Sequence, residues 1–279
     1  MSDQISATVE RTEDTPFSAR IGSLPVFYRD SLIEIHHGDS REKLRGQLVD
    51  CIFTSPPYNA AKEYADHDDD MTADDYWTLI SDVAELCYDI ARPGAYAIWN
   101  VPMWMGNRPK RYVPDLMRLH VGGQGWEFCD EIVWVKGSLE GANAGGSAWG
   151  NYPTSPAIRN ASEPLLIFRK PGGSPRPISD VTWKEWAQLT VGVWPIQCEM
   201  NQRDHPAKFP VELARRVLKL YSAPGELVCD PFLSSGTTAL AEKQLNRRAV
   251  GADISKEYCE LAANRCAQEM AWGKAENSV

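Results

Sequence analysis

The sequence lacks the features that mark several common classes of protein. No uninterrupted apolar run reaches the roughly 18 residues that a membrane-spanning helix needs, and the polar start Met-Ser-Asp-Gln has no basic and then apolar leader. The seven cysteines never stand at the two-residue spacing of zinc or redox pairs, and the five histidines are dispersed. We therefore expect a soluble, cytoplasmic protein with reduced cysteines, no membrane partner and no metal site.

Motifs for three other chemistries are also missing. A phosphate-binding P-loop needs Lys after its last glycine, and Thr237 follows Gly236 instead. No Gly-x-Ser-x-Gly nucleophile elbow occurs in the chain. The acidic run at residues 66–70 has Met71 and Trp77 where a calcium loop requires Gly and Glu, so we interpret it as a solvated loop over the site.

Positive charge is scarce, with 29 Lys and Arg against 38 Asp and Glu and a net charge of −9. This balance argues against a nucleic-acid partner, because basic side chains supply much of the affinity for phosphates. The charges are unevenly distributed, however. Between residues 136 and 184, three acidic residues face six basic ones, which are Lys136, Arg159, Arg169, Lys170, Arg176 and Lys184. The middle of the chain is locally basic, so a nucleic-acid partner remains open.

Hydrophobic periodicity predicts an alternation of strands and helices after a loose polar arm at residues 1–24. Thr72, with Asp75 three residues on, is expected to cap a helix that ends near residue 90. The expected strands are 31–37, 49–54, 95–100, 126–135, 226–229 and 249–254, and the other expected helices are 41–48, 211–221, 237–247 and a last one after residue 254. Strands separated by helices predict an α/β fold whose mainly parallel sheet is covered on both faces.

Composition divides this alternating pattern into two parts. Residues 137–156 are rich in Gly, Ser, Asn and Pro, and regular alternation resumes near residue 210. We therefore expect a first half at residues 25–136, a loop-rich insertion at 137–204, a second half at 205–272 and a tail at 273–279.

The first candidate site is the loop from Asp230 to Thr238, which lies between a predicted strand and a predicted helix. Open parallel sheets bind their ligands at such strand ends. Gly236 permits close backbone approach, and the free amides at the start of the helix suit an anionic group. Asp253 follows Asp230 at about the spacing at which an acid meets ribose hydroxyls in nucleotide-binding folds. A plain turn between strand and helix is the alternative interpretation.

The second candidate is the segment Thr54-Ser55-Pro56-Pro57-Tyr58-Asn59, which also follows a strand. The exocyclic amino nitrogen of a base is a poor nucleophile, because its lone pair is delocalised into the ring. The Ser55 oxygen and the Pro56 carbonyl can accept its hydrogens and turn the lone pair toward a methyl donor. Consecutive prolines hold the carbonyls in one orientation, and Tyr58 offers a stacking face for an extruded base. A rigid surface turn is the alternative.

Together the two motifs resemble those of DNA amino-methyltransferases, whose catalytic signature is Asp, Asn or Ser followed by Pro-Pro and an aromatic residue. The segment at residues 205–210 is similar to the one that completes the methionine pocket in that family. Because the catalytic motif precedes the cofactor loop, the order resembles the β-class, with target recognition lying between them. The resemblance covers most of residues 30–268, and it implies a Rossmann-like methyltransferase fold, S-adenosylmethionine as cofactor and double-stranded DNA as substrate.

The resemblance also assigns residues to roles. The catalytic group is Ser55, Pro56, Pro57 and Tyr58. The cofactor-binding group is Asp39, Thr54, Phe209, Asp230, Pro231, Phe232, Ser234, Ser235, Gly236, Thr237, Asp253 and Ile254. The resemblance does not assign the candidate substrate-binding residues, which are Asn59, Lys62, Asn151, Tyr152, Arg159 and Asn160. Those of the insertion carry donors and acceptors of the kind that read base edges.

Three residues bear on how closely this chain follows the family. Ser234 stands where members usually carry glycine, and Asp253 stands where Glu is common. Ser55 resembles mainly the cytosine-amino enzymes, so we favour N4 of cytosine as the target and keep N6 of adenine as the alternative.

Other functions and partners also remain open. An RNA or protein amide methyltransferase and a catalytically silent DNA-binding subunit are the rival hypotheses. A restriction endonuclease acting on the same site is a candidate partner, and the protein is expected to be a monomer or a homodimer.

Overall fold

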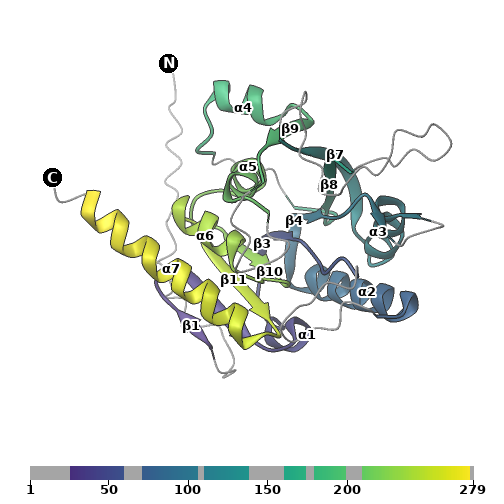
Figure 1. Cartoon of the computed structure of the whole chain (residues 1–279), viewed down its shortest axis with the longest axis horizontal. Helices are drawn as coiled ribbons and strands as arrows, with labels where there is room; N and C mark the ends of the chain where they lie inside the picture. The colour runs from purple at the N-terminus through teal and green to yellow at the C-terminus, as the bar shows by residue number, and fades with distance from the viewer. Residues whose placement is uncertain are drawn as a thin grey trace, which may run out of the picture.

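The computed structural model describes residues 26–59, 71–105, 110–137, 160–173, 179–198 and 209–276, with side chains up to residue 268. Its centre is a nine-stranded sheet in the order β1-β2-β11-β10-β3-β4-β8-β7-β9 (Figure 1). The strands of this sheet are β1 (Tyr28–Arg29), β2 (Ile33–His37), β3 (Val49–Thr54), β4 (Ala91–Asn100), β7 (Glu127–Lys136), β8 (Ser162–Arg169), β9 (Val193–Ile196), β10 (Leu227–Asp230) and β11 (Arg248–Asp253). A separate pair consists of β5 (Trp104–Met105) and β6 (Arg111–Tyr112).

Helices cover both faces of the sheet. They are α1 (Ser40–Lys43), α2 (Ala73–Ile90), α3 (Val113–Gly122), α4 (Trp183–Leu189), α5 (Val211–Tyr221), α6 (Thr237–Gln244) and α7 (Lys256–Glu276). Buried residues of α2 and α3 pack in one core, and buried residues of α5 pack in another. Among the described residues, no helix combines the length and the apolar character needed to cross a membrane.

Strand β3 shows why the sheet needs both layers. Ile52 packs in the core beside α2, whereas its neighbours Cys51 and Phe53 pack in the core beside α5. All three side chains are fully buried. Successive side chains of a strand point to opposite faces, so an almost continuous apolar run requires cover on each side.

The cap predicted for α2 is confirmed. The Thr72 hydroxyl accepts a hydrogen bond from the Asp75 backbone N–H, and it satisfies one of the amides that the first turn leaves without a helical partner. Helix α1 was expected to continue to residue 48, but it ends at Lys43. Gly46 then adopts a left-handed φ of 81°, which turns the chain out of the helix.

The order in which the chain adds parallel strands to the sheet reverses between β10 and β3. These two strands are parallel neighbours, but β3 leads on to β4 on one side and β10 leads on to β11 on the other. Diverging connections open a crevice at the carboxyl ends of the two strands, which is the usual ligand position in such sheets. Both candidate motifs follow these strands directly.

The α/β fold with a mainly parallel sheet is confirmed, and the structure adds strands that were not expected. Residues 162–169, which the sequence analysis placed in the insertion, form β8, an antiparallel neighbour of both β4 and β7. Residues 193–196 of the same region form β9 at the edge. The composition of residues 137–156 is typical of loops, and the strands β8 and β9 follow it before the regular alternation of strands and helices resumes.

Candidate active site

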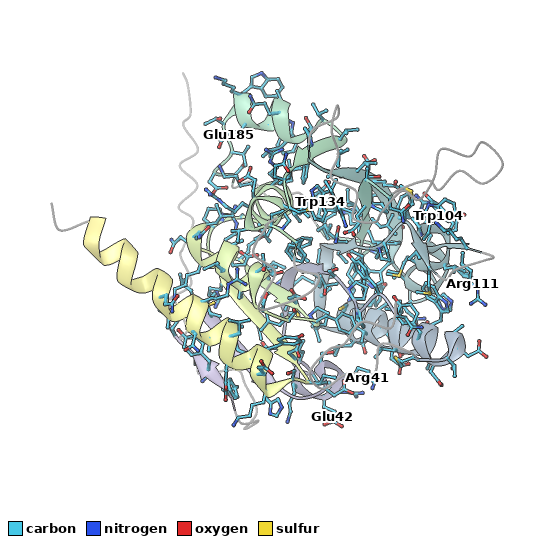
Figure 2. The ribbon with its side chains drawn as sticks, viewed as in Figure 1. Arg41, Glu42, Trp104, Arg111, Trp134 and Glu185 are labelled. Atoms are coloured by element: carbon cyan, nitrogen blue, oxygen red, sulfur yellow. The ribbon has the colours of Figure 1, made fainter. Side chains whose placement is uncertain are left out.

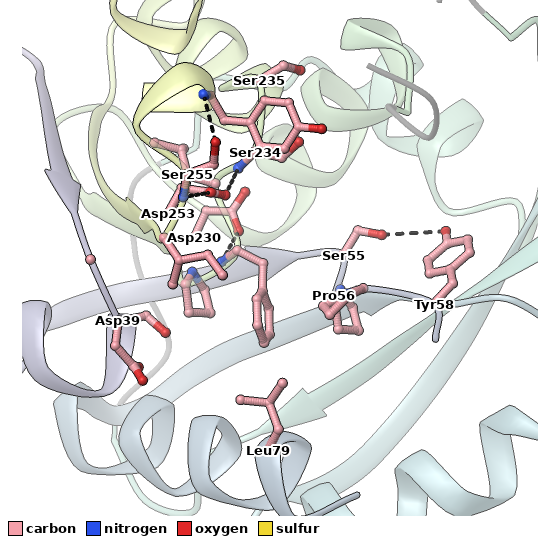
Figure 3. Close-up of a pocket in the computed structure, with 18 of the residues that line it drawn as sticks. Asp39, Ser55, Pro56, Tyr58, Leu79, Asp230, Ser234, Ser235, Asp253 and Ser255 are labelled. Carbon is pink, nitrogen blue, oxygen red and sulfur yellow. Dashed lines mark hydrogen bonds between the residues drawn. The ribbon is translucent and has the colours of Figure 1, made fainter. Parts of the chain in front are cut away.

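A cavity of about 320 Å³ lies at the carboxyl ends of β3, β10 and β11 (Figure 3). Its volume is at the lower end of the range of small-molecule sites. The sequence-predicted residues that line it are Asp39, Ser55, Pro56, Pro57, Tyr58, Phe209, Asp230, Pro231, Phe232, Ser234, Ser235, Thr237, Asp253 and Ile254. The structure therefore brings the two motifs, which are separated by more than 170 residues of chain, to one cavity.

Asp230 is buried at the start of the loop after β10. Its carboxylate accepts hydrogen bonds from the hydroxyls of Thr54 and Thr238, each at 2.7 Å, and from the Phe232 N–H at 3.1 Å. Burial raises the pKa of Asp230 to about 6, although these three donors act in the opposite direction. The described residues supply no cationic partner for this carboxylate.

The loop turns through two left-handed residues before α6. Ser234 has a φ of 49°, and Gly236 has a φ of 74°. A Cβ on Gly236 would lie 2.6 Å from the Cβ of Ala262 on α7, so glycine also allows the helix to pack closely. At Ser234 the same region of φ carries a side chain, which glycine, the residue expected there from the family resemblance, would avoid.

Asp253 connects the loop to the end of β11. Its carboxylate accepts the backbone N–H groups of Ser234 and Ser255, both at 2.8 Å. Asp253 also lines the cavity, so its carboxylate lies where a ligand would meet it.

Asp39 lines the opposite side of the cavity and caps α1. Its carboxylate accepts the backbone N–H of Arg41 and pairs with the Arg41 guanidinium at 2.7 Å. Arg41 is in turn paired with Asp82 of α2. The hydrogen bond from the Arg41 guanidinium is the main cause of the lowered pKa of Asp39.

The segment predicted to be catalytic, Ser55 to Tyr58 (the catalytic segment), follows β3 with Pro56 buried and Ser55 and Tyr58 partly exposed. The Ser55 hydroxyl donates to the Tyr58 phenol oxygen at 3.4 Å, as Figure 3 shows. The Tyr76 hydroxyl of α2 donates to the Pro57 carbonyl at 3.0 Å, which holds the proline pair against the helix. A serine oxygen and an aromatic face are thus both presented to the cavity.

Four of the described sequence-predicted residues, which are Thr54, Asn59, Asn160 and Gly236, do not line the cavity. Thr54 is fully buried beneath the loop, and it acts on Asp230 instead. Gly236 is buried against α7. The Asn59 side chain is engaged with Met71, whose carbonyl and N–H it contacts at 2.9 and 2.8 Å, so its amide supports the loop rather than facing a substrate.

The remaining predicted substrate residues are not tested by the structure. Lys62, Asn151, Tyr152 and Arg159 lie outside the described residues, as does most of the segment at 205–210. Asn160 is exposed just before β8.

Several residues that line the cavity were missed by the sequence analysis, among them Met71, Leu79, Ser255 and Tyr258. Leu79 belongs to α2, and Figure 3 shows it pointing toward the cavity. Helical spacing identifies a buried face, but it does not tell a cavity wall from a packed core.

The locally basic middle of the chain is largely engaged within the protein. The Lys136 ammonium lies 5.3 Å from the ring centroid of Trp134 of β7, which is labelled in Figure 2. Lys136 pairs with Glu163, and Lys170 donates to two backbone carbonyls of the segment 88–91. Arg169 donates to a carbonyl as well. Of the basic residues described there, Lys184 on α4 is exposed, whereas Arg159 and Arg176 lie outside the described part of the chain.

Sequence comparisons place the chain among DNA-modifying enzymes. Residues 49–264 match the family model for N6/N4 methyltransferases, described as DNA methylase. The orphan methyltransferase M.BamHII of Bacillus amyloliquefaciens is 48% identical over 264 residues, a match that covers 81% of this chain and 91% of that protein. The type II methyltransferase M.HpaI of Haemophilus parainfluenzae is 27% identical over 235 residues, covering 82% of this chain and 71% of that protein.

Solved structures agree on the fold. A DNA modification methylase from Thermus thermophilus, TTHA0409, superposes with a TM-score of 0.66 at 25% identity, covering 84% of this chain and 94% of that one. The PvuII cytosine-N4-specific DNA methyltransferase gives a TM-score of 0.65 at 19% identity and covers 84% of this chain and 86% of that one. Since the family model spans most of the chain and one relative shares nearly half of its residues, the chain belongs to the N6/N4 family of DNA methylases, which take the methyl group from S-adenosylmethionine.

Proposed function

We propose that this protein methylates the exocyclic amino group of a base extruded from double-stranded DNA, with N4 of cytosine as the favoured target. The observation that carries the proposal is the shared cavity, where Ser55 and Tyr58 face the loop that begins at Asp230. A duplex hides this amino group, so the base must leave the stack to reach a buried site.

The cavity residues fit S-adenosylmethionine, which supplies an electrophilic methyl group when it is bound. Phe232, Pro231 and Leu79 offer apolar surface for the adenine, and the Asp253 carboxylate suits ribose hydroxyls. Asp230 is a buried acid without a cationic partner among the described residues, and it suits the positively charged methionine end.

The catalytic segment orients the amino nitrogen. Ser55 and the Pro56 carbonyl accept the two amino hydrogens, and Tyr58 stacks on the base, so the nitrogen lone pair points at the methyl carbon. Bound S-adenosylmethionine would supply the methyl group, with the C–N bond forming as the C–S bond breaks. The Ser55 and Pro56 oxygens would pass the released amino proton on to water. All three groups follow the carboxyl end of β3, so they can contact the base without any movement of the sheet.

The test measures methyl transfer in a single turnover with saturating S-adenosylmethionine and duplex DNA from a host that lacks the modification. Ser55→Ala should slow transfer on the order of a hundredfold or more, with cofactor affinity kept. Tyr58→Ala should weaken base stacking by about 1–3 kcal/mol. An unchanged rate for Ser55→Ala would refute the role of this serine. If the unaltered protein transfers no labelled methyl group from S-adenosylmethionine to DNA, the hypothesis of a catalytically silent DNA-binding subunit is supported instead.

Mass spectrometry of nucleosides from the product identifies the base. N4-methylcytosine supports the preference drawn from Ser55, whereas N6-methyladenine moves the target to the alternative. Modification-sensitive sequencing of the same DNA gives the recognition site. We propose that recognition involves residues of the region 137–204, with Asn151, Tyr152, Arg159 and Asn160 as first substitutions to test. Lys62, which follows the catalytic segment, is a further candidate.

A restriction endonuclease that cuts the same sequence remains a proposed partner. Protection of the recognised site from cleavage in extracts of the source cells would identify one. If the extracts do not cleave even unmethylated DNA, the methyltransferase would instead act without a partner endonuclease.

A further inference from the structure

Glu163 on β8 contacts side chains from two neighbouring strands and from the catalytic segment. One carboxylate oxygen, Oε2, accepts the Tyr58 hydroxyl at 2.9 Å and the Asn100 amide of β4 at 3.2 Å. The other oxygen, Oε1, pairs with the Lys136 ammonium of β7. Glu163 is only 7% exposed, so this carboxylate is held away from bulk water beside the proposed site of methyl transfer.

The donors around Glu163 determine the direction of each hydrogen bond. An ionised carboxylate can only accept, and an ammonium can only donate. The Asn100 Nδ2 group donates to Glu163 and also to the Tyr58 oxygen, at 3.1 Å. The Tyr58 hydrogen is therefore directed to Glu163, and the phenol oxygen is left to accept hydrogen bonds from Asn100 and from Ser55.

This direction matters most at Ser55. A serine hydroxyl can donate or accept, whereas the proposed reaction needs an acceptor for the amino hydrogens of the base. With its hydrogen directed to Tyr58, Ser55 presents its lone pairs to the cavity. The 3.4 Å distance between Ser55 and Tyr58 is longer than usual for a hydroxyl pair, and catalytic contacts of this kind often shorten when substrate binds.

We propose that Glu163 is a positioning residue that makes Ser55 a hydrogen-bond acceptor, acting through the Tyr58 hydroxyl. This inference rests on the proposed function and names the residue that directs its key group. The same contact fixes the angle of the Tyr58 ring, so the stacking face is set before the base arrives. Glu163 itself need not touch the base.

The substitution Glu163→Gln tests the direction of the chain of hydrogen bonds. Because Lys136 only donates, the new amide must turn its oxygen toward Lys136 and its NH₂ group toward Tyr58. The Asn100 amide, which donates to Oε2 of Glu163, must then reverse, so that its Oδ1 accepts from residue 163. Tyr58 would accept from residue 163 and would no longer hold its hydrogen on a carboxylate, so its bond with Ser55 can reverse and the serine hydrogen can face the base. We expect single-turnover transfer to slow on the order of tenfold to a hundredfold, with cofactor affinity and thermal unfolding close to those of the unaltered protein.

Two further variants separate this role from a general structural one. In a Tyr58→Phe background the ring remains but the link is cut, so adding Glu163→Gln should change the rate by less than about threefold. Adding Lys136→Met to Glu163→Gln removes the ammonium that turns the amide, so the rate should recover several-fold. Lys136→Met alone leaves Oε2 in place, and its rate should stay within about threefold of the unaltered protein.

The inference is overturned if Glu163→Gln leaves the rate unchanged, if it slows transfer equally with Tyr58 and with Phe at position 58, or if Lys136→Met fails to restore it. Ser55→Ala distinguishes the two proposals. A slow Ser55→Ala variant beside a fully active Glu163→Gln variant contradicts only the role of Glu163, whereas a fully active Ser55→Ala variant contradicts the proposed function of the site.

Discussion

The Thr54 hydroxyl lies 2.7 Å from a carboxylate oxygen of Asp230, across 176 positions of sequence. Thr54 is the last residue of β3, immediately before the catalytic segment, and Asp230 ends β10 at the start of the cofactor loop. This bond spans the point where the connections of the sheet diverge. It fixes the two halves of the site to each other within the buried core, so neither motif depends on a surface contact for its position.

Thr54→Val tests that connection. Valine keeps the shape and removes the donor, which leaves a buried carboxylate with one fewer hydrogen bond. We expect the free energy of unfolding to fall by about 1–3 kcal/mol and cofactor affinity to weaken, measured by urea unfolding and by calorimetry. Thr54→Ser keeps the hydroxyl and serves as the control; a loss in Thr54→Ser with none in Thr54→Val would show that the methyl group, not the hydrogen bond, matters.

The raised pKa of Asp230 predicts a dependence of stability on pH. Burial gives this carboxyl a pKa of about 6 in the folded state, above the ordinary aspartate value of about 3.9 in the unfolded chain. Between these values the folded state holds a proton that the unfolded state has lost, so the contribution of Asp230 to stability is present below about pH 4 and is lost as pH rises through about 6.

The difference in unfolding free energy between the unaltered protein and Asp230→Asn should therefore decrease by about 2–3 kcal/mol from pH 4 to pH 7. Chemical denaturation at a series of pH values measures it, and the variant cancels the other titrating groups. A difference that stays constant with pH would contradict the assignment of this pKa to Asp230.

Cofactor binding should release protons near pH 6. If the methionine ammonium lies beside Asp230, it favours the charged carboxylate and lowers its pKa, so affinity should rise with pH through about 6. Calorimetry at pH 6 in buffers with different enthalpies of ionisation measures the protons released. A binding enthalpy that does not vary with buffer would place the ammonium elsewhere, and Asp230→Asn should abolish any variation.

The left-handed residues of the cofactor loop predict substitutions with opposite effects. Ser234 holds a φ of 49°, where a side chain costs roughly 1–2 kcal/mol. Glycine removes that strain and adds some entropy to the unfolded chain, so Ser234→Gly should leave stability unchanged or raise it by up to about 1 kcal/mol. The melting temperature measures the effect, and a clear decrease would show that the serine side chain contributes more than its strain costs.

Gly236→Ala is the matched change in the opposite direction. The new methyl group meets both an unfavourable φ and the Cβ of Ala262, so α6 and α7 must separate. We expect a loss of at least about 1–3 kcal/mol, read from the same melting curves. Unchanged stability would mean that the loop can adopt another backbone conformation.

Local patterns predicted much of the molecule, because their causes are local. The apolar run of β3 and the Thr72 cap of α2 depend on near neighbours in the chain, and both occur as expected. The two site motifs carry their own turn chemistry in the proline pair and in Gly236. Their order along the chain, together with the residues themselves, was enough to predict the class of enzyme.

Long-range partners were decided only by the tertiary structure. The sequence placed Glu163 in an insertion and Lys136 in the locally basic middle of the chain. In the structure β8 lies between β4 and β7, so Glu163 contacts both Lys136 and Tyr58. Thr54 was expected to contact the cofactor and instead holds Asp230. Strand order decides which side chains meet across a sheet, and it depends on the packing of helices on both faces, which no spacing within one segment contains.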